Sequence, residues 1–499
     1  MAPFAPHALL TGVRLRPGAS PVDIRLREGR IAEVGPRLTS AGAVVHEAGG
    51  ALAMPGLWDG HVHFGQWAAM TRRVDVAGTE SPDEVLARVT RHLLTERPER
   101  GVVVQGYGWR MAGWGRQPST AELDAVAGDH PVILISADCH AGWLSSAAFR
   151  SLGLPVRPGH LDEDDWFPIY TQLADLPEDP GAVRTSLVNA QRQAALKGVV
   201  GIVDMEFETG RLEWPLRTAA GLDLLRVRTC TYPEGLEDAI AAGVRTGDVL
   251  DERGLVTMGP LKVITDGSLN TRTAWCCEPF VTDDDLGDPH GKRSVDPEEL
   301  TELLRRAGAH GLDGAVHAIG DAALLDALDA YAASGARGSI EHAQLVRMEA
   351  LGRFADLGLI ASVQPAHLLD DRDSTEALWP DRLERCFALR SMSDAGISLR
   401  LGSDAPVSPL DPWLAMSAAV HRSADEREPW APEQAITPRE ALLASTDGVS
   451  ELAVGGPGDI VLLAEDPCPA GLPGTAEQAA RLRDAKVLAT FVGGRLTHG

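Results

Sequence analysis

Eight short apolar runs, several of them separated by stretches of helical periodicity, set the pattern of this chain. The runs are rich in Val, Ile and Leu, as strands covered on both faces are. They fall at residues 57–63, 199–205, 225–232, 261–266, 314–318, 339–342, 360–364 and 397–403. Helical stretches at 297–309 and 322–333 lie between later runs, which is the alternation of βαβ units. The pattern predicts an α/β fold built around a parallel (β/α)8 TIM-like barrel.

The interval between the first two runs is too long for a single crossover connection. It covers residues 64–198 and contains apolar runs of its own at 102–105 and 132–136. We therefore expect an insertion with its own strands after the first barrel strand.

Both ends of the chain are rich in predicted strands. They lie at 8–13, 22–27 and 31–34 near the amino terminus and at 458–463 and 487–495 near the carboxyl terminus. Neither group can bury a core alone, so we expect the two to pair in one small β-sandwich. The predicted domains are a composite sandwich of 1–53 with 450–499 and a barrel domain of 54–449, a division that suits a chain of 499 residues.

Composition narrows the class of protein. The net charge of −25, without a run of Lys or Arg, argues against a nucleic-acid partner. A helix needs about 20 consecutive apolar residues to span a membrane, and no uninterrupted apolar stretch approaches that length. The six cysteines form no CxxC pair and the amino terminus has no signal-peptide pattern. These features predict a soluble cytoplasmic protein with reduced thiols.

Metal-competent side chains lie in or directly after the predicted barrel strands. His61 and His63 alternate on the first strand, so both imidazoles lie on one face and could share a metal ion, although an isolated HxH pair is a weak signal. Further candidates follow in order, namely Lys262, His317, His342 and Asp404. A barrel gathers its strand ends at one face, which would bring this set together.

This ordered series resembles the amidohydrolase superfamily of metal-dependent hydrolases, over nearly the whole chain. Four segments are similar to the amidohydrolase-3 branch, which contains N-substituted formamide deformylases. They are Gly106-Tyr107-Gly108-Trp109, Asp138-Cys139-His140-Ala141, the stretch 262–274, and Gly402-Ser403-Asp404-Ala405-Pro406.

The resemblance implies roles for the ordered set. His61 and His63 would hold one ion, a carbamate formed from CO2 on Lys262 would bridge to a second, and His317 and His342 would complete the second site. Asp404 would be both a metal ligand and the general base. The implied cofactors are one or two divalent ions, zinc first, with iron, manganese and cobalt also suited to these ligands. Ordinary alternatives are a lysine that reaches solvent, hydrogen-bonded core histidines and a helix-capping aspartate.

Three further residues complete the expected site. His140 could donate to a developing oxyanion and so act in catalysis. Trp109 and Arg272 could bind substrate through an aromatic surface and a guanidinium. Core packing of the histidine and tryptophan and a solvated arginine are the competing interpretations.

The expected function is metal-dependent hydrolysis of a non-peptide C–N bond in a small linear or cyclic amide, formamide-like, by metal-activated hydroxide with an aspartate base. One alternative is a mononuclear metal deaminase of a cyclic amidine, against which Lys262 argues. Another is a catalytically inactive barrel that acts as a binding protein, because fold alone does not prove function. A homodimer would suit such a barrel, but the sequence fixes neither the oligomeric state nor the substrate.

Overall fold

The structure is a computed structural model that describes residues 7–109, 111, 114–136, 141–170, 173, 180–207, 209–281, 288–424, 427–472 and 474–499. The chain divides into two compact units. Unit 1 joins Met1–Gln66 to Gln191–Gly499, and unit 2 is Trp67–Ala190.

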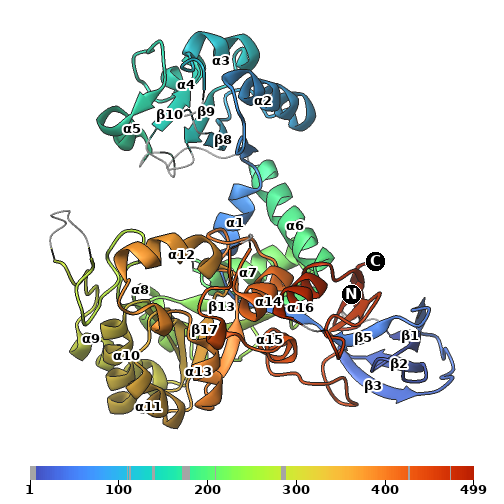
Figure 1. The fold of residues 1–499 in the computed structure, drawn as a ribbon. Coiled ribbons are helices and arrows are strands. Elements are labelled where there is room, and N and C mark those ends of the chain that lie inside the picture. The colour runs from blue at the N-terminus through green and yellow to red at the C-terminus, as the bar shows by residue number, and fades with distance from the viewer. Residues whose placement is uncertain are drawn as a thin grey trace. The chain divides into compact units, whose positions relative to one another are not determined.

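Unit 1 contains the predicted barrel (Figure 1). Within the described residues, eight parallel strands pair in chain order, and a bridge between Val62 and Ala405 brings the last strand back to the first, which nearly closes the sheet. The strands are β6 (Leu57–Val62), β12 (Val199–Asp204), β13 (Arg226–Thr231), β14 (Val256–Ile264), β15 (Gly314–Ala318), β16 (Gly338–His342), β17 (Ile360–Val363) and β18 (Ser398–Leu401). The predicted α/β barrel is confirmed.

Helices connect and cover these strands. They are α7 (Gly210–Ala219), α8 (Pro233–Ala241), α9 (Pro297–Ala309), α10 (Asp321–Ser334), α11 (Leu351–Asp356), α12 (His367–Leu378), α13 (Leu389–Asp394), α14 (Pro412–His421), α15 (Pro438–Ala444) and α16 (Thr475–Arg483). Local signals set their ends: α9 starts with Pro297 after Asp296, and α10 stops at Gly335, whose φ of 68° is left-handed. With helices over the sheet, every residue of β12 is buried, which explains why no polar side chain occurs in it before Asp204.

The two chain ends form two small sheets with one core, as expected. One sheet has the order β3-β2-β1-β4 and the other β21-β20-β19-β5. Their strands are β1 (Ala8–Val13), β2 (Val22–Arg27), β3 (Arg30–Gly35), β4 (Val44–Glu47), β5 (Leu52–Pro55), β19 (Ile460–Leu463), β20 (Val487–Val492) and β21 (Arg495–His498). Leu10 and Ile24 of the first sheet share a buried cluster with Leu462 and Phe491 of the second. The apolar faces that neither terminus could cover alone are thus buried against each other.

Unit 2 has a sheet of its own, in the order β11-β10-β9-β8-β7. Its elements are β7 (Val74–Asp75), α2 (Pro82–Glu96), β8 (Val104–Trp109), α3 (Thr120–Ala127), β9 (Val132–Ser136), β10 (Ala141–Leu144), α4 (Ser146–Ser151), β11 (Leu161–Asp162) and α5 (Glu163–Tyr170). Helices α1 (Phe64–Met70) and α6 (Pro180–Leu196) contain the points where the chain passes between the units. In the described part of the chain, no helix is long and apolar enough to cross a membrane.

One barrel strand starts earlier than its sequence pattern predicts. β14 begins at Val256, although Gly259 and Pro260 break the apolar run that was expected to start at Leu261. A Cβ added to Gly259 would lie 2.8 Å from the Thr229 carbonyl oxygen of β13. The glycine is therefore required by close contact with the neighbouring strand, where sequence alone suggests a strand break.

Candidate functional site

His61, His63 and Asp404 form the centre of the site. The Nε2 atoms of both histidines lie 3.5 Å from Asp404 Oδ1. The Asp404 N–H donates to the His61 carbonyl (2.7 Å) and the His63 N–H to the Ala405 carbonyl (2.9 Å). These bonds hold the segment after β18 against β6, so the nearly closed barrel itself sets the approach of the carboxylate to the histidine pair.

His317 and His342 come from the next ligand-bearing strands, β15 and β16. Their ring centroids are 4.5 Å apart, and that of His342 is 5.0 Å from His61. His342 has a φ of 71° and Ala343 one of 42°, left-handed values that are unusual for residues with a side chain. Backbone strain of this kind is common where a functional side chain must be aimed. The structure thus brings both expected histidines to the His61 side of the barrel.

His367 joins this group, although the sequence did not single it out. It is the first residue of α12, and its Nε2 lies 3.9 Å from Asp404 Oδ2. His342, His367 and Asp404 form one group that could hold a metal ion, and His61, His63 and Asp404 form another. The sequence signal for His367 was its position three residues after the predicted strand 360–364. It was missed because the other candidate ligands were sought in or directly after strands, whereas His367 lies in the first turn of a helix.

Buried carboxylates orient the histidines. Glu341 Oε2 lies 2.6 Å from His61 Nδ1, and Asp266 Oδ1 lies 2.9 Å from His317 Nδ1. When Nδ1 carries the ring proton and donates a hydrogen bond to the carboxylate, the lone pair of Nε2 is free to bind a cation. Asp59 acts on the backbone instead, because it accepts the N–H groups of His61 (3.1 Å) and Ser403 (2.9 Å). His61 and His317 are thus each hydrogen-bonded to a carboxylate, as metal-binding histidines usually are.

Lys262 is buried on β14 with 1% of its surface exposed. Among the residues that the structure describes, none is a hydrogen-bond partner of its Nζ, although a buried ammonium without a partner is costly. Burial lowers the pKa of Lys262, which favours the neutral amine. The alternative of a lysine that reaches solvent is therefore wrong for Lys262, because its amine is buried.

The electrostatics of the site suit a bound cation. Burial is the main cause that lowers the pKa of His63 to about 4, and burial also lowers that of His367 to about 4. Burial raises the pKa of Asp404 to about 7, because the ionised carboxylate loses its water. The buried His342 Nδ1 and His367 Nε2 have no hydrogen-bond partner among the described residues. Neutral imidazoles and a desolvated carboxylate are the donor set that zinc and similar ions take.

A hydrogen-bonded network fixes the loops beside the site. Asp371 of α12 accepts from Asn270 Nδ2 (3.0 Å) and Gln344 Nε2 (3.1 Å). These three residues follow β14, β16 and β17, and Asp371 lies one turn after His367 on α12. The network links the segments that carry His342 and His367 to the loop that contains Arg272.

The remaining predicted site residues have different surroundings. Trp109 is 1% exposed in the core of unit 2, and its indole Nε1 donates to the Leu134 carbonyl (3.0 Å), as packing would explain. Arg272 is half-buried in the loop after β14, with a left-handed φ of 56°. His140 lies outside the described residues. The substrate-binding and oxyanion roles of these residues stay predictions.

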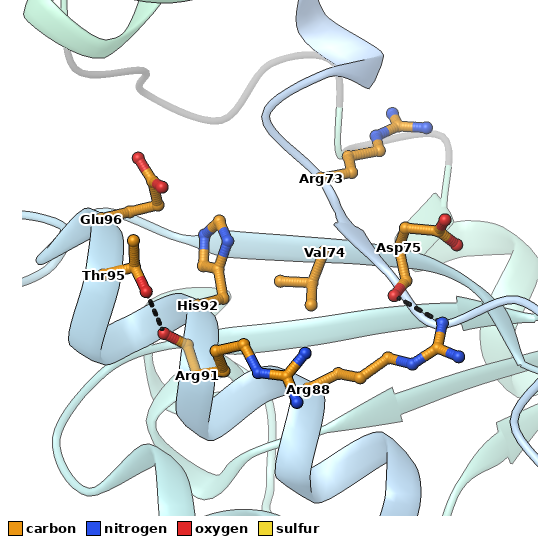
Figure 2. A pocket seen from close by; sticks show the side chains of 8 residues that line it. All are labelled: Arg73, Val74, Asp75, Arg88, Arg91, His92, Thr95 and Glu96. Carbon is orange, nitrogen blue, oxygen red and sulfur yellow. Dashed lines mark hydrogen bonds between the residues drawn. The ribbon is translucent and has the colours of Figure 1, made fainter.

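A cavity of about 460 Å³ lies within unit 2 (Figure 2). Arginines and one histidine dominate its lining, and Arg88 is held there by a bond to the Asp75 carbonyl (3.1 Å). The lining residues are Arg73, Val74, Asp75, Arg88, Arg91, His92, Thr95 and Glu96. All eight lining residues belong to unit 2, whereas the candidate metal ligands belong to unit 1.

Comparison with known proteins agrees with this geometry. The sequence profile of the amidohydrolase family matches residues 44–498, nearly the whole chain. The chain belongs to the amidohydrolase family. The predictions of this family and of an enzyme are confirmed.

Two relatives and one solved structure are similar to this amidohydrolase over most of its length. An N-substituted formamide deformylase of Arthrobacter pascens is 27% identical over 94% of this chain and 93% of its own length. Protein LONG AFTER FAR-RED 3 of Arabidopsis thaliana is 28% identical over 94% and 87%. The crystal structure of an uncharacterized metal-dependent hydrolase from Pyrococcus furiosus has a TM-score of 0.77 and 25% identity, and the match covers 93% of this chain and all of that one.

Proposed function

We propose that the protein hydrolyses a non-peptide C–N bond of a small amide, linear or cyclic and formamide-like, with the help of one or two divalent metal ions. The observation that carries the proposal is the convergence of His61, His63, His342, His367 and Asp404 in two overlapping groups. The similarity to a formamide deformylase supports the choice of bond.

The metal would be held by the imidazole nitrogens and the Asp404 carboxylate. When bound, a divalent ion supplies Lewis acidity, which lowers the pKa of a coordinated water to about 7 and polarises a carbonyl. Zinc is the first choice because neutral imidazole and carboxylate are its usual ligands.

Asp404 is the residue we propose as the general base. Its carboxylate belongs to both groups of candidate ligands and is buried. A bound cation would keep this carboxylate ionised, so that it could accept a proton from the attacking water and pass it to the leaving nitrogen. The proton would thus move on and off Asp404 once in each turnover.

Lys262 is proposed to carry a carbamate. The neutral Nζ would attack the carbon of CO2 and form an N–C bond. One C=O π pair would move onto its oxygen, and the nitrogen would lose one proton to a water molecule, which leaves a carbamate anion. The product would replace a buried amine, for which the described residues provide no hydrogen-bond partner, with an anionic oxygen group that could bridge two metal ions. The buried position and lowered pKa of Lys262 support this step.

The test is product analysis on zinc-reconstituted protein with N-substituted formamides, a cyclic amide and a cyclic amidine. We expect amine and formate from the formamides, or ring opening of the cyclic amide, and loss of at least about 100-fold in kcat for Asp404→Asn. His310→Ala, at an exposed position, is the control and should leave kcat unchanged. Ammonia from the amidine, with both amides untouched, would replace the proposal with a deaminase. Equal rates for wild type and Asp404→Asn would remove Asp404 as the base.

A further inference from the structure

Phe207 is an exposed aromatic side chain beside the proposed metal ligands. Its exposed fraction is 61%, and it lies three residues beyond the end of β12. The ring stacks on that of His63, with centroids 5.5 Å apart and an interplanar angle of 25°. An apolar surface therefore continues directly from a metal-binding imidazole.

The surroundings of Phe207 hold it in this exposed position. Its other ring neighbour is Tyr232, at 5.0 Å, whose hydroxyl donates to the Met205 carbonyl (2.8 Å). The Phe207 N–H donates to Glu206 Oε1 (3.1 Å), and Glu206 also accepts from the Gln66 N–H (3.0 Å) and Nε2 (2.9 Å). Glu206 is thus a structural anchor of this segment.

A second exposed apolar residue follows the strand on the other side of β6. Val407 is 67% exposed and follows Asp404 in a tight turn, in which the Val407 N–H donates to the Asp404 carbonyl (2.9 Å). The segment with Phe207 follows β12 and that with Val407 follows β18, while β6 with His61 lies between the two strands. Exposed apolar residues thus follow the strands on both sides of β6.

We propose that Phe207 contacts the substituent on the nitrogen of the scissile amide and sets a preference for an apolar group there. This inference rests on the proposed function, since a formamide-like substrate has only hydrogen on its acyl side and an apolar group must sit on nitrogen. Isolated exposed apolar side chains are common and need no function. Phe207 differs because hydrogen bonds hold its segment in place and its ring stacks on a metal-ligand candidate, His63.

Binding of two metal-chelating formamide analogues, N-benzyl-N-hydroxyformamide and N-hydroxy-N-methylformamide, tests this assignment by calorimetry on zinc-reconstituted protein. We expect wild type to bind the benzyl compound about tenfold more tightly, through aromatic contact with Phe207. Phe207→Ala should lose this preference but bind the methyl compound as wild type does, and Phe207→Tyr should keep it. Leu212→Ala, at a 51% exposed position on α7, is the matched control and should retain the preference.

The outcomes separate the inference from the proposed function. An unchanged benzyl-to-methyl ratio in Phe207→Ala, with zinc content and thermal midpoint equal to wild type, would overturn the role of Phe207 alone. Failure of wild type to bind either compound while it retains zinc would overturn the proposed function and this inference with it. With N-benzylformamide as substrate, Phe207→Ala should raise KM about tenfold and leave kcat near wild type, a split that general misfolding would not produce.

Discussion

Burial controls the protonation of the residues at the candidate metal site. The pKa of His61 and that of His342 are well below the usual value, with burial as the main cause, so both rings are neutral at pH 7. Burial also raises the pKa of Asp59 to about 6, as it does more strongly for Asp404. Since a cation favours an ionised carboxylate and binds neutral imidazole, it would offset the desolvation of the whole group.

His367 provides the residue-scale prediction. If it is a ligand, His367→Ala should weaken zinc binding by about 10- to 100-fold or more, since changes of even outer partners cost that much. Competition with a chromogenic chelator measures the affinity directly. His310→Ala removes an exposed histidine and should leave the affinity unchanged. Equal zinc affinities for His367→Ala and wild type would exclude His367 from the ligand set.

Sequence reasoning identified candidate ligands where the residue belongs to a strand. His61, His317 and His342 lie within predicted strands, and alternation plus strand order suffices to place such residues at one end of a barrel. His367 was missed because it follows a strand on a helix, where its direction depends on how α12 packs. Phe207 was missed because a strand pattern says nothing about exposure of a residue beyond the strand end.

At the element scale, a capping box joins α15 to α13. Thr437 and Glu440 cap the first turn of α15 reciprocally. Glu440 also accepts two bonds from the Arg390 guanidinium of α13, at 2.9 and 2.8 Å. One carboxylate therefore stabilises both the start of a helix and its contact with a neighbour.

Glu440→Gln should remove the part of the protein's stability that depends on the ionisation of the Glu440 carboxylate. Hydrogen bonds from Arg390, the largest cause, lower the pKa of Glu440 from 4.5 to about 2 in the folded protein. A carboxylate with a depressed folded pKa stabilises the fold fully above its unfolded pKa, and this contribution is lost as the pH falls toward the folded pKa.

Thermal midpoints of wild type and Glu440→Gln from pH 7 to pH 2 test this relation. Wild type should unfold at a higher temperature at pH 6 to 7, and the difference should shrink steadily below about pH 4.5. Glu298→Gln, at an exposed position in the first turn of α9, is the comparison for a carboxylate with no bidentate arginine partner. A difference that stays constant down to pH 2 would contradict the account.

Element prediction was accurate where apolar runs were uninterrupted. The bounds of β9, β15 and α9 agree with the predicted 132–136, 314–318 and 297–309. The two-residue strands β7 and β11 were not predicted, because two residues cannot show alternation. The burial of Trp109 could not be predicted either, since it depends on the contacts of its indole with the core of unit 2.

At the scale of the whole molecule, the candidate ligands come from segments far apart in the chain. His61 and Asp404 are separated by more than 340 positions, yet their strands meet where the barrel closes. An ion bound here would join the first, sixth and eighth strands with α12. Binding only the folded state, it would stabilise the protein by about 4 kcal/mol at 1,000 times its Kd.

Metal content per chain, measured by plasma mass spectrometry, tests the central claim most directly. Wild type and Lys262→Ala would be purified without chelators, in the presence of bicarbonate. We predict about two ions per wild-type chain and one or fewer in Lys262→Ala, as a bridging carbamate requires. About one ion in both would exclude the bridge and favour a mononuclear enzyme. Absence of any ion from folded wild type, even after incubation with zinc, would contradict the assignment of His61, His63, His342, His367 and Asp404 as a metal site.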